Sequence, residues 1–300
     1  MEDSTTDKHR QGLGAAIGAY TIWGFLPLYL ILVKTVPAFE FVGWRVIWTL
    51  PLCLLFIVVR RQGPDLLAAI RSPRVMGWLT ISALLIGSNW LIYVWAIQTG
   101  NIYAASLGYY INPLINVLLG TLLLGEKLST RQWVAVALAG IGVSLLLGGA
   151  LTTLWISLSL ALSFGFYGLI RKQVPVGSVP GLTIETLVLV APALAIVLYY
   201  AQLPAGSAFT RDIGLSAAIM LGGVVTAVPL LMFAISARIL PYSTVGFLQF
   251  IAPSIVFVLG LTVFDQPLKP AQAACFGFIW LAAAIFVWDL ISKRGQSAAN

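Results

Sequence analysis

Ten apolar segments, each about as long as a membrane-spanning helix, follow one another along this chain. They cover residues 12–33, 39–59, 75–97, 102–124, 132–149, 152–170, 181–201, 213–235, 243–264 and 272–291. An α-helix needs about 20 apolar residues to cross the hydrocarbon core of a bilayer. A helix also satisfies its backbone hydrogen bonds internally, as hydrocarbon requires. The sequence therefore predicts an all-α polytopic membrane protein with ten transmembrane helices.

The composition excludes several other classes of protein. Hydrophobic residues make up 60% of the chain and charged residues only 9%, against about 25% charged residues in a soluble domain. The net charge of +7 comes from basic residues gathered at the ends of the apolar segments, so membrane topology explains it better than nucleic-acid binding does. The only histidine, His9, lies in the polar N-terminal tail. We therefore expect no nucleic-acid partner, no histidine-based metal site and no catalytic triad.

The distribution of lysine and arginine predicts the orientation. With the N-terminus inside, thirteen of the seventeen basic residues fall on cytoplasmic segments and only Lys34, Arg211 and Lys269 fall outside. Arg45 lies within an apolar segment. Cytoplasmic segments are enriched in basic residues, so both tails, residues 1–11 and 292–300, are expected in the cytoplasm.

The longest inner connection, residues 60–74, has room for a short helix on the membrane surface. We expect that helix to run from Asp65 to Ile70.

The chain repeats itself with an offset near 140 residues. Residues 12–148 match residues 152–291, and Pro113 is echoed by Pro253. Each half holds five predicted helices, an odd number, so the second half must insert upside down. Inverted repeats are typical of secondary transporters and place a substrate site near the midplane between the halves. The alternative is an old duplication without a transport role.

A set of polar and aromatic residues lies within the apolar segments. Tyr109, Asn112 and Asn116 are three and four residues apart, so they share one helix face. Pro113 leaves the carbonyl of Tyr109 without its helical donor, and this face should avoid lipid. The full set predicted to line a substrate pathway is Arg45, Asn89, Trp90, Tyr93, Tyr109, Asn112, Asn116 and Gln249. The alternative for the amides is hydrogen bonding between helices.

Arg45 and Glu185 are the two charged residues predicted to lie deep within segments. They are 140 residues apart, so they occupy equivalent places in the repeat. Their helices run in opposite directions, which separates them by roughly 10–15 Å along the membrane normal and argues against a direct salt bridge. A charge within the membrane is a functional hypothesis. Arg45 is a candidate for attracting an anionic substrate group, or else reaches the outer headgroups. Glu185 is a candidate proton acceptor, or else bonds nearby hydroxyl or backbone groups.

Prolines interrupt six of the predicted helices. They are hinges for alternating access or fixed kinks, and they are Pro27, Pro51, Pro113, Pro192, Pro229 and Pro253. The chain has no phosphate-binding glycine loop of the P-loop kind and no intramembrane carboxylate cluster for metal chemistry. We therefore expect no ATP motor, no cofactor, no metal and no enzymatic activity.

Several stretches resemble the EamA-like drug/metabolite transporter superfamily, in particular its RarD-type subgroup. They are Ala19-Tyr-Thr-Ile-Trp-Gly24, Arg45-Val-Ile-Trp48, Ile86-Gly-Ser-Asn-Trp90, Val94-Trp-Ala96, Ala105-Ser-Leu-Gly-Tyr-Tyr-Ile-Asn-Pro-Leu114, Leu124-Gly-Glu-Lys127, Ser163-Phe-Gly-Phe-Tyr-Gly168, Arg171-Lys172, Ile184-Glu-Thr186, Thr226-Ala-Val-Pro229 and Phe278-Ile-Trp280. The stretch Ser106-Leu-Gly-Tyr-Tyr-Ile-Asn-Pro-Leu114 is the most specific of these. Two places differ from the family pattern. Ala104 replaces an acidic residue of some relatives, and Phe264-Asp265-Gln266 replaces the second Gly-Glu-Lys, which keeps a carboxylate but loses the glycine and the lysine.

The resemblance implies a multi-pass protein of the bacterial inner membrane that exports small amphipathic metabolites or drugs without ATP. Proton coupling through Glu185 is the working hypothesis, and an uncoupled facilitator is its alternative. A membrane-embedded enzyme or lipid-handling protein is the alternative of another class. The expected partners are a small-molecule substrate and the lipid bilayer, with the chain as a monomer or a homodimer.

Overall fold

The computed structural model describes residues 2–147 and 151–297 and, within them, an all-helical bundle without strands. Its α-helices are α1 (Glu2–Leu32), α2 (Ala38–Val59), α3 (Gly63–Arg71), α4 (Pro73–Gln98), α5 (Ile102–Leu122), α6 (Thr130–Ser144), α7 (Leu154–Gln173), α8 (Ser178–Gln202), α9 (Ile213–Ile239), α10 (Tyr242–Leu248), α11 (Ile251–Thr262) and α12 (Pro270–Ser297). Two short 3₁₀ turns, η2 (Leu151–Thr153) and η3 (Ala208–Thr210), precede α7 and α9.

The predicted membrane helices are present. Nine spans in the described ranges are long and apolar enough to cross a bilayer, with α10 and α11 together forming one of them. The tenth predicted helix is α6, whose 15 residues fall short of a full span and which packs along α12. Residues 148 and 149 of its predicted range lie outside the described residues. A helix is present where the short connecting helix was predicted, as α3 covers Asp65 to Ile70. Its position on the membrane surface stays a prediction.

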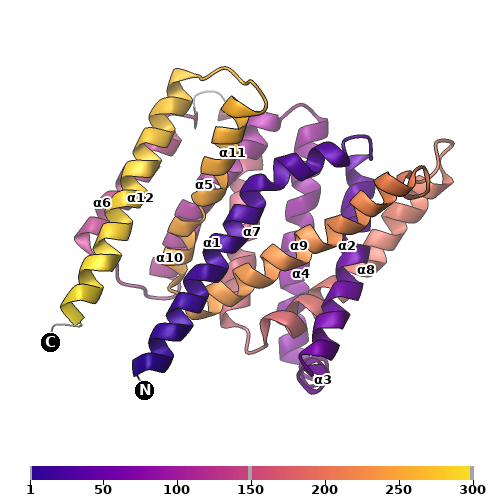
Figure 1. Cartoon of the computed structure of the whole chain (residues 1–300), viewed down its shortest axis with the longest axis horizontal. Coiled ribbons are helices and arrows are strands. Elements are labelled where there is room, and N and C mark those ends of the chain that lie inside the picture. Colours follow the sequence, from indigo (N-terminus) through magenta and orange to yellow (C-terminus); the bar gives the residue numbers. More distant parts are fainter. Residues whose placement is uncertain (1, 148–150, 298–300) are drawn as a thin grey trace.

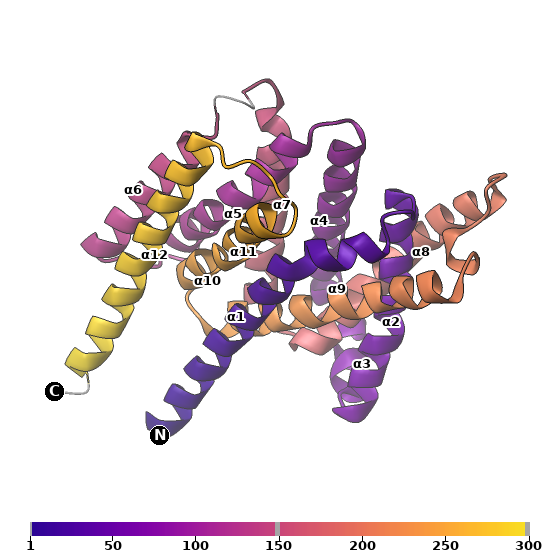
Figure 2. The same ribbon diagram turned by 45° about the horizontal axis from the view of Figure 1, so that its top comes forward.

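Both termini lie at the same end of the bundle, together with α3 (Figure 1). We call this end the terminal face; it also carries the connections 123–129 and 174–177. The connections 33–37, 99–101, 203–212 and 263–269 lie at the opposite end, the loop face (Figures 1 and 2). Two termini on one face require an even number of crossings, as the sequence predicts.

The two halves use their equivalent prolines differently. Pro113 lies inside the continuous helix α5, but the segment predicted as one helix over 243–264 is broken between Leu248 and Ile251 into α10 and α11. Proline removes a backbone donor and crowds the preceding turn, and the break falls in the turn before Pro253. The sequence predicts an interruption at all six prolines, and of these only Pro253 follows a helix break in the described residues.

The packing partners show a regular exchange pattern. Helix α1 packs against α9 and α11, and α7 packs against α4 and α5. Helix α2 packs against α9, and helix α8 packs against α4. The pairs α2 with α8, α5 with α10, and α6 with α12 join equivalent helices of the two sequence halves. If each helix is replaced by its equivalent in the other half, the same set of packing pairs results.

Helices α2 and α9 make their closest approach at a pair of glycines. A Cβ atom on Gly223 would lie 2.4 Å from the backbone carbonyl carbon of Trp48, and one on Gly222 would lie 3.2 Å from Cγ of Arg45. The hydroxyl of Thr49 donates to the carbonyl of Gly223 at 3.3 Å. Small residues let membrane helices approach this closely, and here they bring α9 against the turn of α2 that carries Arg45.

We predict that Gly223→Ala lowers the stability of the bundle, because the added methyl group meets backbone atoms that cannot rotate away. Overpacking of this kind costs about 1–3 kcal/mol. Thermal unfolding of the purified protein in detergent measures the effect. Gly77→Ala in α4 is the matched control, because no atom lies within 4 Å of its added Cβ. Equal unfolding temperatures for the two variants would contradict the assigned contact.

Candidate functional site

Arg45 is anchored about two turns into α2 from the loop face. Its Nε donates to the hydroxyl of Thr226 in α9 at 2.9 Å. Thr226 in turn donates to the carbonyl of Gly222 at 2.7 Å. The missing side chain of Gly222 leaves room for the arginine stem. Arg45 is therefore fixed through one nitrogen by α9, and its two terminal nitrogens remain.

Aromatic side chains surround the Arg45 guanidinium. Its central carbon lies 4.9 Å from the ring centre of Trp90 and 5.7 Å from that of Phe41. A guanidinium over an aromatic face is a favourable cation–π arrangement. The hydroxyls of Tyr29, Tyr93 and Tyr109 lie within its electrostatic reach, and the rings of Tyr93 and Tyr109 meet edge to face at 5.5 Å. Four of the predicted pathway residues thus come together here: Arg45, Trp90, Tyr93 and Tyr109.

Several hydrogen-bond donors of this cluster have no acceptor among the described residues. Among the described residues, no carboxylate lies within salt-bridge distance of Arg45, and its terminal nitrogens have no hydrogen-bond acceptor. The hydroxyl of Tyr29 donates to the carbonyl of Ala218 at 2.9 Å, whereas those of Tyr93 and Tyr109 have no partner in the described part of the chain. Tyr109 is 45% exposed, so the cluster keeps an accessible side.

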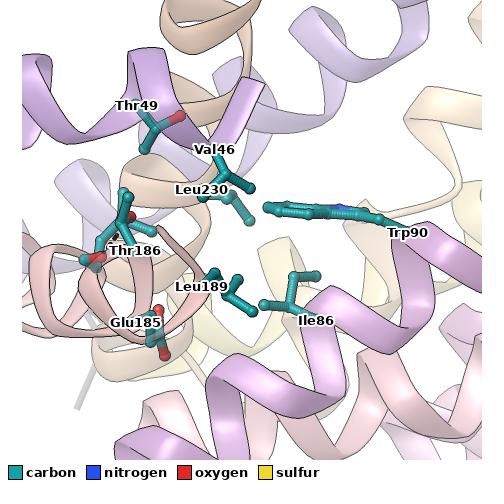
Figure 3. Close-up of a pocket in the computed structure, with 9 residues that line it drawn as sticks. Val46, Thr49, Ile86, Trp90, Glu185, Thr186, Leu189 and Leu230 are labelled. Atoms are coloured by element: carbon teal, nitrogen blue, oxygen red, sulfur yellow. Dashed lines mark hydrogen bonds between the residues drawn. The ribbon is translucent and has the colours of Figure 1, made fainter. Parts of the chain in front are cut away.

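A small cavity separates this cluster from Glu185 (Figure 3). Trp90 lies at one end of it and Glu185 at the other, with Val46, Ile86 and Leu189 among the apolar residues between them. Its volume of about 10 Å³ is room for roughly one water molecule. One carboxylate oxygen of Glu185, Oε2, is buried without a hydrogen-bond partner in the described residues. Glu185 is therefore one of the residues that a water molecule in this cavity would meet.

Glu185 is matched by a second buried charge. Its Oε1 accepts from the hydroxyl of Ser82 at 2.6 Å and lies 3.6 Å from Nε of Arg171, with both side chains almost completely buried. Arg171 also donates to the carbonyl of Ser178 at 3.0 Å. No direct bridge joins Glu185 to Arg45 among the described residues.

The expectation that only Arg45 and Glu185 are deep charges was wrong. Arg171 follows an apolar segment as the first residue of an Arg-Lys pair, and such a pair is typical of a helix end in the headgroup region. In the structure it is 1% exposed. Gly181 provides the space, since a Cβ atom there would overlap the guanidinium. The absence of any side chain at position 181 is the only sequence signal for this burial.

Two of the predicted pathway amides hydrogen-bond each other. Asn116 Nδ2 in α5 donates to Oε1 of Gln249, just after α10, at 2.6 Å. The hydroxyl of Tyr242 lies 3.0 Å from Asn116 Oδ1 and 2.7 Å from the carbonyl oxygen of Gly165 in α7, and its one proton is shared between these two acceptors. This network ties three helices together, which is the interhelical role that amides often have in membranes.

The other two amides are placed differently. Asn89 in α4 donates to the carbonyl of Leu160 at 2.8 Å and to the hydroxyl of Ser163 at 2.9 Å, both in α7. Asn112 is 3% exposed, and its Oδ1 has no partner in the described residues. None of the four amides has a described hydrogen bond to Arg45, although α5 carries Asn112 one turn beyond Tyr109.

The six predicted hinge prolines occupy two kinds of position. Pro27, Pro51, Pro113, Pro192 and Pro229 lie inside continuous helices. Pro253 lies in the first turn of α11, directly after the break. Helix α1 is visibly bent in its second half (Figures 1 and 2). Whether any of these positions moves during function remains a prediction.

Glu126 makes a long-range contact that the sequence reasoning missed. After a turn at Gly125 with φ +67°, its carboxylate accepts from the backbone N–H of Tyr242 and, at 2.8 Å, from that of Ser243. These are the first N–H groups of α10, which have no partner inside the helix. We call this contact the Glu126 latch. It joins the connection after α5 to the start of α10 at the terminal face.

The second half has no such latch. The left-handed turn falls at Asp265 with φ +48°, and Gln266 N donates to the carbonyl of Gly260 just as Glu126 N donates to that of Gly120. Gly125 therefore matches Asp265, and Glu126 matches Gln266, one residue away from the alignment expected from sequence. The expectation that the second motif keeps its carboxylate was wrong, because an amide takes its place.

The asymmetry has a structural consequence. Gln266 has no side-chain hydrogen bond in the described part of the chain, and α5, the counterpart of α10, begins at Asn101 without a side-chain cap. On the terminal side, Lys172 further holds the end of α9 by donating to the carbonyls of Ala237 and Leu240 at 2.9 and 2.6 Å. The loop face joins the halves at another place, where the carboxylate of Glu40 in α2 accepts from Ser207 and from the backbone N–H of Ala208 at the start of η3.

An aromatic cluster fills the space on the terminal side of Arg45. Tyr20, Phe164, Tyr167 and Phe233 are buried and form ring contacts with one another or with Trp23. Tyr20 lies nine residues before Tyr29 in α1, or about 13 Å closer to the terminal face. We call these five residues the aromatic plug. Its ring contacts join α1, α7 and α9.

Comparison with known proteins adds an independent line of evidence. A model of the EamA-like transporter family matches residues 10–148. An uncharacterized transporter of Pseudomonas aeruginosa is 42% identical over 280 residues, which cover 93% of this chain and 94% of that protein. Protein RarD of Escherichia coli is 40% identical over 291 residues, covering 96% of this chain and 98% of that protein. A solved crystal structure has a TM-score of 0.72 over 92% of this chain and 97% of its own, at 18% identity, and shows a shared fold.

We predict that Glu185→Gln and Arg171→Gln each destabilise the protein. Removing one partner of a buried ion pair strands the other charge, which costs about 3–5 kcal/mol. The double variant strands no charge, so its unfolding temperature in detergent should recover most of the loss. Additive losses in the double variant would contradict a matched pair.

We predict that Glu126→Ala speeds hydrogen–deuterium exchange at the start of α10. Loss of a charged acceptor costs about 1.5–3 kcal/mol, or roughly ten-fold or more in the exchange of the Tyr242 and Ser243 amides. Mass spectrometry of a peptide that begins several residues before Pro241 and includes Tyr242 and Ser243 measures it. Gln266→Ala is the control and should leave this peptide unchanged. Unaltered exchange in Glu126→Ala would show that the latch does not protect these amides.

Proposed function

Since this chain belongs to the EamA-like transporters, in the RarD-type subgroup, we propose that it is a secondary transporter that moves small amphipathic solutes across the bacterial inner membrane. Export, with both termini in the cytoplasm, is the direction proposed from the family and from the basic residues of the terminal face. The chain carries out no chemistry on its solute in this proposal. Relatives with the same length and about 40% identity carry the names RarD or transporter, which supports transport but names no solute.

The observation that carries the proposal is the partly exposed Arg45 cluster between helices of the two halves. Arg45 and Trp90 come from the first half, and Thr226, which anchors Arg45, comes from the second. Ligand sites of secondary transporters lie between repeats near the midplane. The exchange pattern of the helix packing supports two inverted repeats, residues 12–148 and 152–291, as the moving units.

The asymmetry between the two faces supports alternating access. The Glu126 latch and the aromatic plug lie on the terminal side, whereas different contacts join the halves at the loop face: Glu40 accepts from the backbone of Ala208, and Trp44 stacks on Phe209. In this proposal, release of the latch and rearrangement of the plug open the terminal side, while the loop side closes over Arg45. Rocking of one half against the other would accomplish both steps. The in-helix prolines are candidate positions for the bending that this rocking requires.

Proton coupling through Glu185 is the proposed energy source. One oxygen of its carboxylate has no partner in the described residues. Glu185 also lines a cavity that could hold a water molecule, and Arg171 balances its charge. Protonation of Glu185 would release Arg171 from its only carboxylate partner in the described chain. The groups facing Glu185 are Ser82 from α4, Arg171 and Tyr167 from α7, and Cys53 from α2. An uncoupled facilitator would keep the pair intact throughout its cycle.

We predict that the purified protein in liposomes moves solutes at a rate that depends on an imposed pH gradient, and that Glu185→Gln abolishes this dependence. A screen of amino acids and aromatic drugs with labelled solute measures the flux. Asp65→Asn, at an exposed carboxylate in α3, is the control and should retain the response.

Two outcomes would contradict parts of this account. Flux that ignores the gradient in the native protein and in Glu185→Gln would rule out coupling at Glu185 and favour a facilitator. An absence of flux for every solute, from protein shown to be folded by size-exclusion chromatography, would count against transport itself and favour a lipid-handling role.

A further inference from the structure

We propose that the Arg45 cluster is a binding site for an organic anion, a molecule with one carboxylate attached to a flat apolar body. The inference rests on the proposed function, because it names the class of solute that the transporter carries. It concerns the end of the solute that Arg45 holds and the walls against which the rest of the solute packs.

The charge of the site calls for an anion. Arg45 has no carboxylate within salt-bridge distance in the described residues, although an unmatched charge is costly inside a membrane. The charge of Glu185 is balanced by Arg171, and Glu40 accepts from Ser207 and from the backbone of Ala208 through one oxygen at 2.6 and 2.8 Å. The Arg45 cluster itself contains no carboxylate that could receive an ammonium group, which favours a monoanion over a zwitterion or a cation.

The geometry of Arg45 favours a carboxylate. Its guanidinium carbon lies above the ring of Trp90, and Nε is held by Thr226. The two terminal nitrogens can therefore present parallel N–H groups, the arrangement that binds a carboxylate through both oxygens. The hydroxyls of Tyr93 and Tyr109 supply two further donors near the same charge.

The walls favour a flat apolar body. Trp90 and the edge-to-face pair Tyr93 and Tyr109 offer aromatic surface beside the guanidinium, and Tyr109 is 45% exposed despite its position within a membrane helix. Aromatic and apolar walls with a few fixed polar groups are the usual composition of small-molecule sites. A ring joined to a carboxylate would pack against the walls while its charge meets Arg45.

Binding to the full-length protein in detergent tests the site without requiring transport. The probes are 2-naphthoate, its neutral amide 2-naphthamide and the cation 2-naphthylmethylammonium, followed by equilibrium dialysis. We expect naphthoate to bind and the other two to bind at least about ten-fold more weakly, since a hydrogen bond to a charged group contributes about 1.5–3 kcal/mol.

The variants separate the site from the fold. Arg45→Gln should weaken naphthoate binding about ten-fold or more, and Arg45→Lys should restore part of it because the charge remains. Thr226→Val keeps the charge but frees Nε and should give an intermediate affinity. Arg211→Gln is the control: Arg211 is an exposed arginine of the loop face that bonds only backbone carbonyls in the described chain, and its loss should change nothing.

Several results would overturn the inference. These are equal binding of the amide, unchanged naphthoate binding in a folded Arg45→Gln protein, and no naphthoate binding at all. Displacement of naphthoate by equimolar inorganic phosphate would assign the site to small inorganic anions. Displacement by phosphatidylglycerol but not phosphatidylcholine would assign it to a lipid headgroup. Arg45-dependent binding without flux in liposomes would uphold the site and refute transport, whereas flux of neutral solutes without naphthoate binding would do the reverse.

Discussion

The structure depends on the cost of an unmatched charge inside a membrane. Hydrocarbon offers no water to a buried ionic group, so such a group needs a partner of opposite charge or several hydrogen bonds. Glu185 has Arg171 and Ser82, and Glu126 has the backbone N–H groups of α10. Arg45 keeps two terminal nitrogens without an acceptor and, unlike Arg171, has no carboxylate within salt-bridge distance among the described residues. Arg45 lies between the two halves, so its unused donors mark the proposed solute site.

The same constraint explains how the halves are joined. The carboxylate of Glu126, on the connection after α5, accepts from the first backbone N–H groups of α10. This contact between the halves therefore also satisfies a charged group. In the second half an amide occupies the equivalent place, and the start of α5 lacks the corresponding cap. A sequence difference of one functional group thus makes the two faces unequal at equivalent positions, and Glu40 joins the halves at the loop face through other partners, Ser207 and Ala208.

Much of the fold was predictable from the sequence, because helix length and apolarity are set directly by bilayer thickness. The ten segments, the short helix α3 and the shared face of the termini follow from that constraint. The break before Pro253 did not, since the same residue type leaves α5 continuous at Pro113 and the difference lies in the packing around each proline.

The candidate site was predictable only in part. Arg45, Trp90, Tyr93 and Tyr109 were expected to line a pathway, and they meet at one cluster. Asn89, Asn116 and Gln249 were expected there too, but their hydrogen bonds join helices. Arg171 and Glu126 escaped notice because each lies where a segment ends, and sequence periodicity says nothing about partners more than a hundred residues away.

Counterflow in liposomes tests the central claim most directly, because only a carrier whose site faces one side at a time shows it. Liposomes loaded with unlabelled 2-naphthoate would be diluted into a trace of labelled naphthoate. The account predicts transient accumulation of label above its outside concentration, lost in Arg45→Gln and kept in Arg211→Gln. Simple equilibration without an overshoot, or an overshoot that persists in Arg45→Gln, would contradict the claim that Arg45 holds the solute at an alternately exposed site.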